Sequence, residues 1–241
     1  MGSFSPGDPV AVGQLFDQIA PRYDQLNDLL SLGLHRLWKR QAIAWVQPRP
    51  GQRLLDLCCG TGDLALVLAA KVRPGGLVVG LDAAAAPLAL AARRAAAQPW
   101  LPLQWRQADA LATGLADGWA EGAVMAYGLR NLADPLAGLV ELRRLLRPGA
   151  RAAVLDFNRP DGTGAPPERA AAALQRLALR QVVVPVASAA GLREHYAYLE
   201  TSLERFPTGG QQRQLAREAG FGLARHRPLA GGLMGLLELV A

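Results

Sequence analysis

Cysteine is scarce in this sequence of 241 residues, and the two cysteines that occur, Cys58 and Cys59, are adjacent. Adjacent cysteines cannot cross-link distant parts of a fold, and they lack the C-x-x-C spacing of zinc and redox sites. A secreted disulfide scaffold is therefore excluded, and we expect a reducing compartment. A chain of this length buries about 70% of its extended surface on folding, so it needs no metal or disulfide for stability.

Long hydrophobic runs are also missing. The longest, such as residues 64–70 and 77–81, are far shorter than the roughly 20 residues that a membrane-spanning helix requires. Residues 1–10 have neither the basic start nor the apolar core of a signal peptide. We therefore expect a cytoplasmic protein without a signal peptide or transmembrane segment.

Lysine is limited to Lys39 and Lys71, yet arginine raises the basic total to 26 against 20 acids, a net charge of +6. Such a balance can indicate nucleic acid or an anionic membrane as a partner. Most arginines are scattered, which favours an ordinary basic surface. The exception is the basic window, residues 36–53, which has no acid and is a candidate for phosphate or lipid headgroups; its basic residues are Arg36, Lys39, Arg40, Arg49 and Arg53.

Short apolar runs alternate with helical stretches from residue 51 onward. Each of the first four runs is expected to lead through a turn into a helix, and this alternation predicts a mostly parallel, doubly wound α/β sheet with helices on both faces. Two later runs joined by a five-residue connection predict an antiparallel hairpin at the sheet edge. The predicted strands are residues 53–58, 77–81, 103–105, 123–127, 152–157, 222–227 and 233–240.

The organisation along the chain predicts one domain with four segments. Apolar residues at helical spacing over residues 10–46 indicate that residues 1–50 form an N-terminal helical cap. Residues 51–157 form a cofactor-binding α/β core, and residues 158–208 form a helical insertion that serves as a substrate lid. Residues 209–241 supply a C-terminal helix, capped by Thr208, and the edge strands.

A glycine-containing turn follows the first predicted strand, in the sequence DLCCGTGD of residues 56–63. Gly60, Thr61 and Gly62 let the backbone approach a ligand near free N–H groups at a helix start. The third glycine of a dinucleotide fingerprint is missing, and Asp63 would repel a pyrophosphate, which argues against an NAD oxidoreductase. An acid here suits a ligand with ammonium and sulfonium groups, which indicates S-adenosylmethionine (SAM).

Further acids follow the second and third predicted strands. Asp82 is placed to accept both ribose hydroxyls of SAM, and Asp109 with the backbone of Ala110 is placed to hold the adenine amino edge. Each acid alone could simply cap the next helix. The ordered set predicts a SAM site without a metal, and it consists of Asp56, Gly60, Thr61, Gly62, Asp82, Asp109 and Ala110.

The two cysteines within the turn allow two interpretations, a nucleophile or small residues that fill a tight bend. Methyl transfer from SAM needs no covalent enzyme intermediate, so we favour the second.

Two segments carry a family resemblance: residues 23–39, YDQLNDLLSLGLHRLWK, and residues 127–134, YGLRNLAD. They resemble signatures of the quinone C-methyltransferases of ubiquinone and menaquinone biosynthesis, in particular the cyanobacterial and plastid branch. The resemblance covers about residues 10–240 and implies a class I SAM-dependent methyltransferase (Rossmann-like) fold with a seven-stranded sheet. It implies methylation of 2-phytyl-1,4-naphthoquinol or demethylmenaquinol, the last step of phylloquinone or menaquinone biosynthesis. A benzoquinol C-methyltransferase of ubiquinone biosynthesis is the nearest alternative.

The chemistry implied is methylation of a ring carbon. A quinone carbon is electrophilic, so the substrate must be the reduced quinol, whose deprotonation makes the neighbouring carbon nucleophilic. We expect Arg130 to stabilise the quinolate and Asn131 to orient a hydroxyl or a water, because both follow the fourth strand at the carboxyl-end crevice. The alternative is a helix-capping Asn131 with a surface-paired Arg130. His195 is a candidate proton acceptor, although a histidine on an apolar stripe is more often a core residue.

The resemblance also implies partners. Tyr23, Asn27, His35, Tyr127 and Tyr196 are candidate substrate contacts. A prenylated quinol partitions into lipid, so we expect transient contact with the cytoplasmic face of a thylakoid or plasma membrane through the basic window. A homodimer is possible. No nucleic acid partner is expected, because the fourth strand does not lead into the Asn-Pro-Pro-Tyr type of loop used by base methyltransferases.

Overall fold

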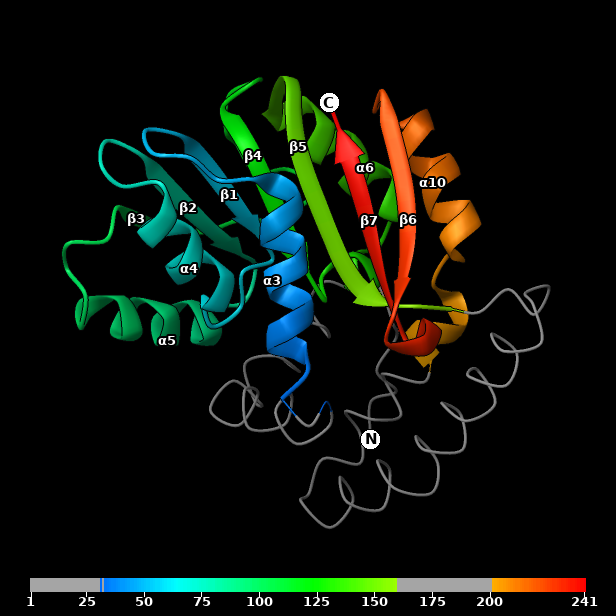
Figure 1. The fold of residues 1–241 in the computed structure, drawn as a ribbon, viewed down its shortest axis with the longest axis horizontal. Coiled ribbons are helices and arrows are strands. Elements are labelled where there is room, and N and C mark those ends of the chain that lie inside the picture. The colour runs from blue at the N-terminus through cyan, green and yellow to red at the C-terminus, as the bar shows by residue number, and fades with distance from the viewer. Residues whose placement is uncertain (1–30, 32, 160–200) are drawn as a thin grey trace, which may run out of the picture.

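The computed structural model describes residues 31, 33–159 and 201–241. In these ranges, seven strands form one sheet in the order β3-β2-β1-β4-β5-β7-β6 (Figure 1). The strands are β1 (Arg53–Leu57), β2 (Leu77–Asp82), β3 (Leu103–Gln107), β4 (Ala120–Ala126), β5 (Leu146–Phe157), β6 (Leu223–Leu229) and β7 (Met234–Val240). Each strand predicted from the sequence is confirmed, with shifts at the ends.

The sheet is parallel from β3 to β5, and β7 runs antiparallel to both of its neighbours, β5 and β6. The predicted hairpin at the sheet edge is therefore confirmed. Its inner strand is β7, which lies between β5 and the edge strand β6. β7 is buried over nearly its whole length, whereas β6 carries Arg225, Arg227 and Pro228 and is only partly buried. The apolar strand takes the interior position because a charged, proline-containing strand tolerates an unpaired edge.

Helices cover both faces of the sheet, as predicted. α3 (His35–Val46) and α4 (Asp63–Lys71) pack against one face, while α6 (Pro135–Leu145) and α10 (Gly209–Glu218) pack against the other. α5 (Ala85–Ala96) packs on β2 and β3, on the side of α4 (Figure 1). Short 3-10 turns lie at η2 (Leu129–Asn131) and η4 (Ala230–Gly232).

Alternation along β1 decides which side chains reach each face. Leu55 and Leu57 join the core beneath α6 and α10, whereas Leu54 joins the core beneath α3 and α4. Asp56 has the same strand parity as Leu54, and its carboxylate accepts from the N–H of Ala65 on α4. Two apolar layers thus sandwich the strand, and its one acid is directed toward the α4 side near the end of the strand.

One predicted helix is wrong. The segment after β3, residues 108–119, forms turns and a single bridge. Gly114 and Gly118 adopt left-handed φ values of 66° and 60°, which interrupt a right-handed helix. Thr113 also donates from its backbone N and its hydroxyl to Oε1 of Glu141 on α6, at 3.0 and 2.6 Å. These contacts to a distant helix replace the local hydrogen bonds that a helix would make.

Side chains cap two helix starts, and the cap predicted from the sequence, Thr208, is confirmed. Asp134 Oδ1 accepts from the N–H groups of Leu136 and Ala137 at 2.8 and 3.1 Å, with Pro135 in the first turn of α6. Thr208 caps α10 in a reciprocal arrangement, because its hydroxyl accepts from Gln211 N while Gln211 Oε1 accepts from Thr208 N. Such caps each stabilise a helix by about 1 kcal/mol.

The predicted cap and lid fall mainly on residues 1–30 and 160–200, which lie outside the described residues, so these segment boundaries stay predictions. None of the helices in the described ranges has the length and apolar composition of a membrane span. Those ranges also contain no group of three side chains suited to hold a metal ion.

His226 on β6 is a half-buried titratable group at the sheet edge. Its ring lies between Gly209, at the start of α10, and Gly235 on β7, where a Cβ at either glycine would collide with the ring. No hydrogen-bond partner reaches its buried Nε2 from the described part of the chain. Burial, reinforced by the charge of Arg213, lowers the pKa of His226 to about 4.

We therefore expect the free energy of unfolding to fall as the pH drops from about 6.5, the pKa of histidine in an unfolded chain, toward 4. In this window the imidazole of His226 is protonated in the unfolded chain but stays neutral in the folded protein. The free energy of unfolding therefore falls by about 1–3 kcal/mol. Urea denaturation at pH 7.0 and 4.5 measures it. His226→Gln should show a correspondingly smaller loss, and an equal loss in both proteins would contradict this assignment.

Candidate functional site

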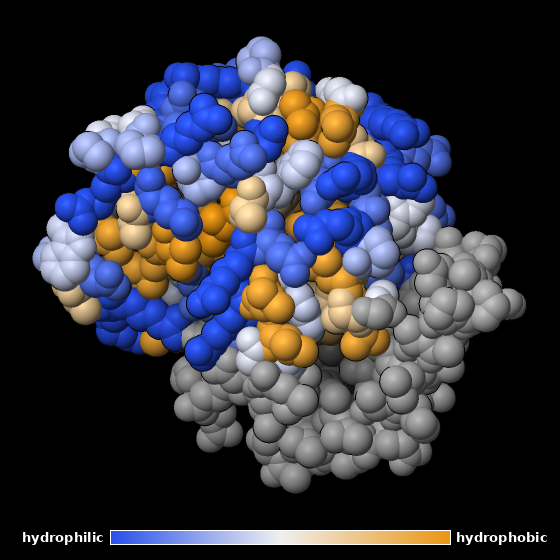
Figure 2. All heavy atoms as spheres, in the orientation of Figure 1, coloured by the Kyte–Doolittle hydropathy of each residue, from blue (hydrophilic) through white to orange (hydrophobic). Residues whose placement is uncertain are grey.

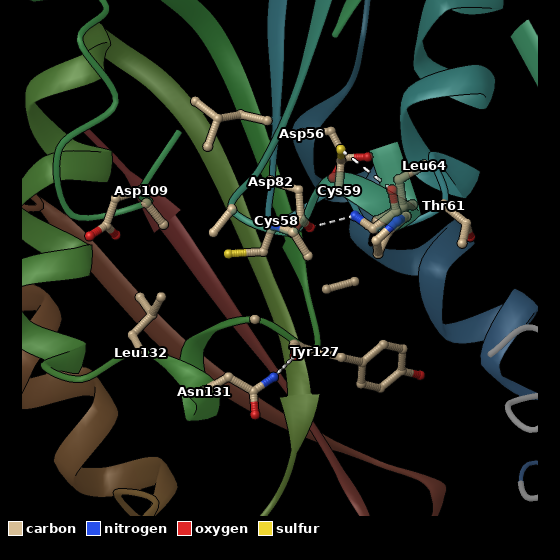
Figure 3. A pocket seen from close by; sticks show the side chains of 18 of the residues that line it. Asp56, Cys58, Cys59, Thr61, Leu64, Asp82, Asp109, Tyr127, Asn131 and Leu132 are labelled. Atoms are coloured by element: carbon tan, nitrogen blue, oxygen red, sulfur yellow. Dashed lines mark hydrogen bonds between the residues drawn. The ribbon is translucent and has the colours of Figure 1, made fainter. Parts of the chain in front are cut away.

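A cavity opens at the carboxyl ends of the parallel strands. It is lined by the segments that follow β1, β2, β3 and β4 and by one residue of α3 (Figure 3). Because parallel strands end at the same edge of a sheet, polar residues that are distant in sequence converge here. Six of the seven residues predicted to bind SAM line this cavity: Asp56, Gly60, Thr61, Asp82, Asp109 and Ala110.

The seventh, Gly62, lies behind the cavity wall. It has a left-handed φ of 84°, and a Cβ at this position would come within 2.6 Å of the Trp105 ring and 3.0 Å of Ala91. Gly62 is thus required where α4, α5 and β3 pack together. The sequence predicted the glycine turn, but it could not distinguish Gly60, which lines the cavity, from Gly62, which packs against Trp105. That distinction depends on tertiary packing.

Asp82 connects the ends of β1 and β2. Its Oδ2 accepts from the N–H of Gly60 at 2.7 Å, and its Oδ1 accepts from the N–H of Ala84 at 3.0 Å (Figure 3). Two backbone donors therefore fix the orientation of this carboxylate. Each carboxylate oxygen has a second lone pair, so Asp82 can accept further hydrogen bonds from hydroxyl groups in the cavity.

Asp56 is a buried carboxyl group with one orphaned oxygen. It is 1% exposed, and its Oδ2 accepts from Ala65 N at 2.9 Å. Its Oδ1 has no hydrogen-bond partner among the described residues. Burial raises the pKa of Asp56 to about 8. The group is therefore largely protonated at neutral pH, and a cation placed against Oδ1 would favour its ionised form.

Asp63 begins α4 and is engaged by two protein cations. Its carboxylate pairs with Lys39 at 3.0 Å and with Arg94 at 3.1 Å. Burial would raise the pKa of Asp63, but these charges outweigh burial and lower it. The sequence argument assigned Asp63 to a ligand ammonium group. In the structure this carboxylate lines the cavity and already pairs with two cations of the protein, so its contact with a ligand stays a prediction.

Asp109 lies opposite, after β3. Its Oδ1 accepts from the N–H of Leu111 at 2.9 Å, which fixes the turn that presents the buried Ala110 to the cavity. Figure 3 shows Asp109 across the cavity from Asp56 and Asp82. The three predicted acids therefore surround one space, although 27 to 53 residues separate Asp109 from the other two along the chain.

The end of β4 forms the remaining wall. Tyr127 adopts a left-handed φ of 61°, and its backbone N donates to Leu155 O at 2.7 Å. Nδ2 of Asn131 donates back to Tyr127 O at 2.8 Å, so the predicted site residues Tyr127 and Asn131 hold one turn together beside the cavity (Figure 3). A left-handed conformation is uncommon for a bulky residue, and such strain concentrates at functional sites.

The cysteines fill the bend after β1. Cys58 also has a left-handed φ, of 58°, and a Cβ on Gly128 would collide with its side chain. Burial, followed by the charges of nearby acids, raises the pKa of both thiols well above the usual value. Neither cysteine is therefore a thiolate at neutral pH, which supports the interpretation of these residues as packing groups.

Arg130 does not line the cavity. Its Nε lies 3.4 Å from Oδ1 of the buried Asp156, and its Nη1 donates to Asn131 Oδ1 at 2.8 Å. The guanidinium also stacks 5.3 Å from the ring centre of Phe157. The sequence left two alternatives for Arg130, a contact to the quinolate or an ion pair at the surface. The ion pair that the structure shows is with the buried Asp156, and a contact to the quinolate stays untested. Arg130 is a buried ion-pair residue that supports Asn131.

The remaining predicted site residues either lie away from the cavity or fall outside the described residues. His35 is buried at the start of α3 and does not line the cavity. Tyr23, Asn27, His195 and Tyr196 fall in the ranges that the structure does not describe, so their roles stay predictions.

Lys39 is a charged cavity residue that sequence reasoning did not assign to the site. The basic window made it a candidate for binding phosphate or lipid headgroups, but its side chain is only 12% exposed and lines the cavity. Its Nζ also lies 5.8 Å from the ring centre of Tyr127. The sequence did contain one indication: Lys39 is next to Trp38 in the apolar pattern of this helix. A charged residue beside such an apolar stripe can be partly buried at the edge of the core.

Comparison with known proteins identifies the family. A family model described as the ubiE/COQ5 methyltransferase family matches residues 7–237. A Synechocystis sp. protein named 2-phytyl-1,4-naphtoquinone methyltransferase is 49% identical over 228 residues, which cover 94% of this chain and 93% of that protein. The chloroplastic 2-phytyl-1,4-beta-naphthoquinone methyltransferase of Arabidopsis thaliana is 42% identical, with 92% and 84% covered.

Solved structures share the fold at low identity. A SAM-dependent methyltransferase from Aquifex aeolicus gives a TM-score of 0.59 at 17% identity and covers 97% of this chain and 98% of its own. The [4+2]-cyclase SpnF gives a TM-score of 0.67 at 16% identity, with 99% and 98% covered. These similarities confirm the predicted class I methyltransferase fold. By the family match and the near full-length relatives, the chain belongs to the ubiE/COQ5 methyltransferase family and is a SAM-dependent methyltransferase.

Proposed function

We propose that this enzyme methylates the ring carbon of 2-phytyl-1,4-naphthoquinol, the final step of phylloquinone biosynthesis. The observation that carries this proposal is the 49% identity over 94% of the chain to a protein named for that reaction. The chloroplast relative, 42% identical, bears the same substrate in its name. The cavity at the strand ends provides the site in which donor and acceptor would meet.

The residues of the cavity fit SAM. The orphaned Oδ1 of Asp56 is a buried acceptor suited to the ammonium group, and Asp82 is oriented to accept from ribose hydroxyls. Asp109 and the backbone of Ala110 would hold the adenine edge. When bound, SAM supplies an electrophilic methyl group on a sulfonium. The acids of this wall favour that cationic cofactor over a pyrophosphate.

The chain's own contribution to chemistry is to hold and orient the quinol. A phenolic hydroxyl that loses its proton raises the electron density of the neighbouring ring carbon. That carbon would bond to the methyl group as the methyl–sulfur bond of SAM breaks, and the ring hydrogen would then leave as a proton, which restores the aromatic quinol. We assign Asn131 to orient that hydroxyl or a water that accepts its proton. Arg130 is a positioning residue that acts through Asn131, and His195 is retained as the proposed proton acceptor.

The reaction is tested with purified enzyme, SAM and chemically reduced 2-phytyl-1,4-naphthoquinone, with products weighed by mass spectrometry. We expect one added methyl group on the naphthoquinol and no product from the oxidised quinone, whose ring carbon is electrophilic. A demethylated ubiquinone precursor in parallel tests the benzoquinol alternative. Preferential methylation of the benzoquinol, or no product from either ring, would refute the proposed substrate.

Arg130 and Asn131 should behave as one unit. Arg130→Lys keeps a cation beside Asp156 but cannot reach both Asp156 and Asn131 with a planar fork. We expect Arg130→Lys and Asn131→Ala each to lower kcat about 10- to 100-fold, because a misplaced orienting group loses that much. SAM affinity, measured by calorimetry, should stay within about 3-fold, a change under 1 kcal/mol.

The double variant Arg130→Lys/Asn131→Ala should be no slower than Asn131→Ala, because both substitutions remove the same interaction. Val140→Ala, on the exposed side of α6, is the control for a general effect on folding. Losses that multiply in the double variant would instead mean that Arg130 contacts the quinolate independently of Asn131.

We also propose a transient membrane contact through α3. Leu34 and Leu37 are 46% and 50% exposed, and the side chains of Arg36 and Arg40 are exposed on the same helix and its start. Figure 2 shows hydrophobic and hydrophilic side chains next to each other over this helix. Apolar side chains flanked by arginine suit an anionic lipid surface, where the phytyl chain of the substrate resides.

Co-sedimentation with vesicles tests this contact. We expect stronger binding to vesicles with anionic lipid than to neutral ones, by about 1 kcal/mol per arginine near the surface. Arg36→Gln/Arg40→Gln should lose most of that difference, whereas Arg217→Gln on the exposed side of α10 should keep it. Equal binding to neutral and anionic vesicles would count against the contact.

A further inference from the structure

We propose that Lys39 binds the α-carboxylate of SAM, while the orphaned oxygen of Asp56 receives the ammonium group of the same methionine moiety. The inference rests on the SAM-dependent activity of the enzyme and not on the identity of the quinol. It assigns a cofactor contact to α3, an element outside the α/β core in which the sequence located the whole SAM site.

The first observation is position. Lys39 projects from α3 into the cavity wall, between the turn after β1 and the turn after β4. Its Nζ donates to Asp63 Oδ2 at 3.0 Å and stands 5.8 Å from the ring centre of Tyr127. These two contacts hold the ammonium group at the cavity. A lysine has three donors, so the bond to Asp63 leaves capacity for a ligand.

The second observation is charge. Asp63 provides a single negative charge to two cations, Lys39 at 3.0 Å and Arg94 at 3.1 Å. Lys39 and Arg94 therefore share the one carboxylate of Asp63. Lys39 is only 12% exposed, and a shielded cation is costly unless an anion compensates it. A ligand carboxylate against Lys39 would add a second anion to the one that Asp63 shares between two cations.

The third observation is that the described lining of the cavity offers no other cation. Among the described residues that line it, Lys39 is the one basic side chain, and four others carry carboxyl groups: Asp56, Asp63, Asp82 and Asp109. SAM carries one anionic group, its α-carboxylate, and two cationic groups. A single lysine in an acidic wall matches that distribution.

The geometry of the wall also fixes the direction of the methionine moiety. Lys39 and Asp56 both line this cavity. Asp56 has a buried Oδ1 without a partner in the described ranges. A zwitterion can thus engage both groups at once. The start of α4 at Asp63 adds the positive end of a helix dipole on the carboxylate side.

The test compares two ligands on two proteins by isothermal titration calorimetry: SAM and decarboxylated SAM, which lacks only the carboxylate. Lys39→Met removes the charge while keeping an extended side chain. We expect this variant to bind SAM about 10- to 100-fold more weakly, the range for a hydrogen bond to a charged group. Its affinity for decarboxylated SAM should match the wild type within about 3-fold.

Lys71→Met is the matched control, because it removes the other lysine, exposed at the far end of α4. It should leave the affinity for both ligands unchanged. Lys39→Arg should recover part of the lost SAM affinity, since it restores the cation. This recovery separates carboxylate binding from a purely structural role of the Lys39–Asp63 pair.

Two results would overturn the proposal. Equal loss of affinity for SAM and decarboxylated SAM would make Lys39 a structural residue, and unchanged SAM affinity with a lower kcat would move it to the quinol. The outcome is independent of the proposed substrate. A wild type that binds SAM but methylates neither quinol refutes the substrate alone, whereas product formation with an unaffected Lys39→Met variant refutes only the lysine assignment.

Discussion

The fold depends on one constraint, the burial of β1 on both faces and along both edges. β1 pairs in parallel with β2 and β4, and four of its five residues are buried. A strand enclosed in this way has little room for polar side chains except where it ends. The polar groups therefore gather beyond the carboxyl ends of β1, β2 and β4, and the cavity forms where these ends meet.

The acids at this edge are accommodated in three different ways. Burial leaves Asp56 largely protonated, with an orphaned oxygen. Asp63 is balanced by Lys39 and Arg94, and Asp82 is held by two backbone N–H groups. Several unpaired carboxylates in one apolar cavity would repel each other strongly. Distinct environments allow them to coexist and present a surface suited to a cofactor with two cationic groups.

Function is carried by these side chains and not by the fold. The [4+2]-cyclase SpnF shares the architecture with a TM-score of 0.67, which illustrates that one scaffold accommodates different chemistry. In this protein, connected contacts order the segment after β4. Asn131 bonds to Arg130 and to the backbone of Tyr127, and Arg130 pairs in turn with the buried Asp156. This chain of contacts rigidifies the cavity wall that follows β4.

The sequence by itself determined the features that depend on local physics. Buried strands, the Gly60-Thr61-Gly62 turn and the caps at Asp134 and Thr208 follow from hydrophobic period and from which residues satisfy a helix start. The two signature segments were sufficient to indicate the family. Tertiary structure alone decided the rest, because those outcomes depend on residues far apart in sequence. Thr113 donates a hydrogen bond to Glu141, and no helix forms after β3. Lys39 donates to Asp63, and its side chain is largely buried. Burial and pairing are properties of the assembled sheet, and a local pattern cannot specify them.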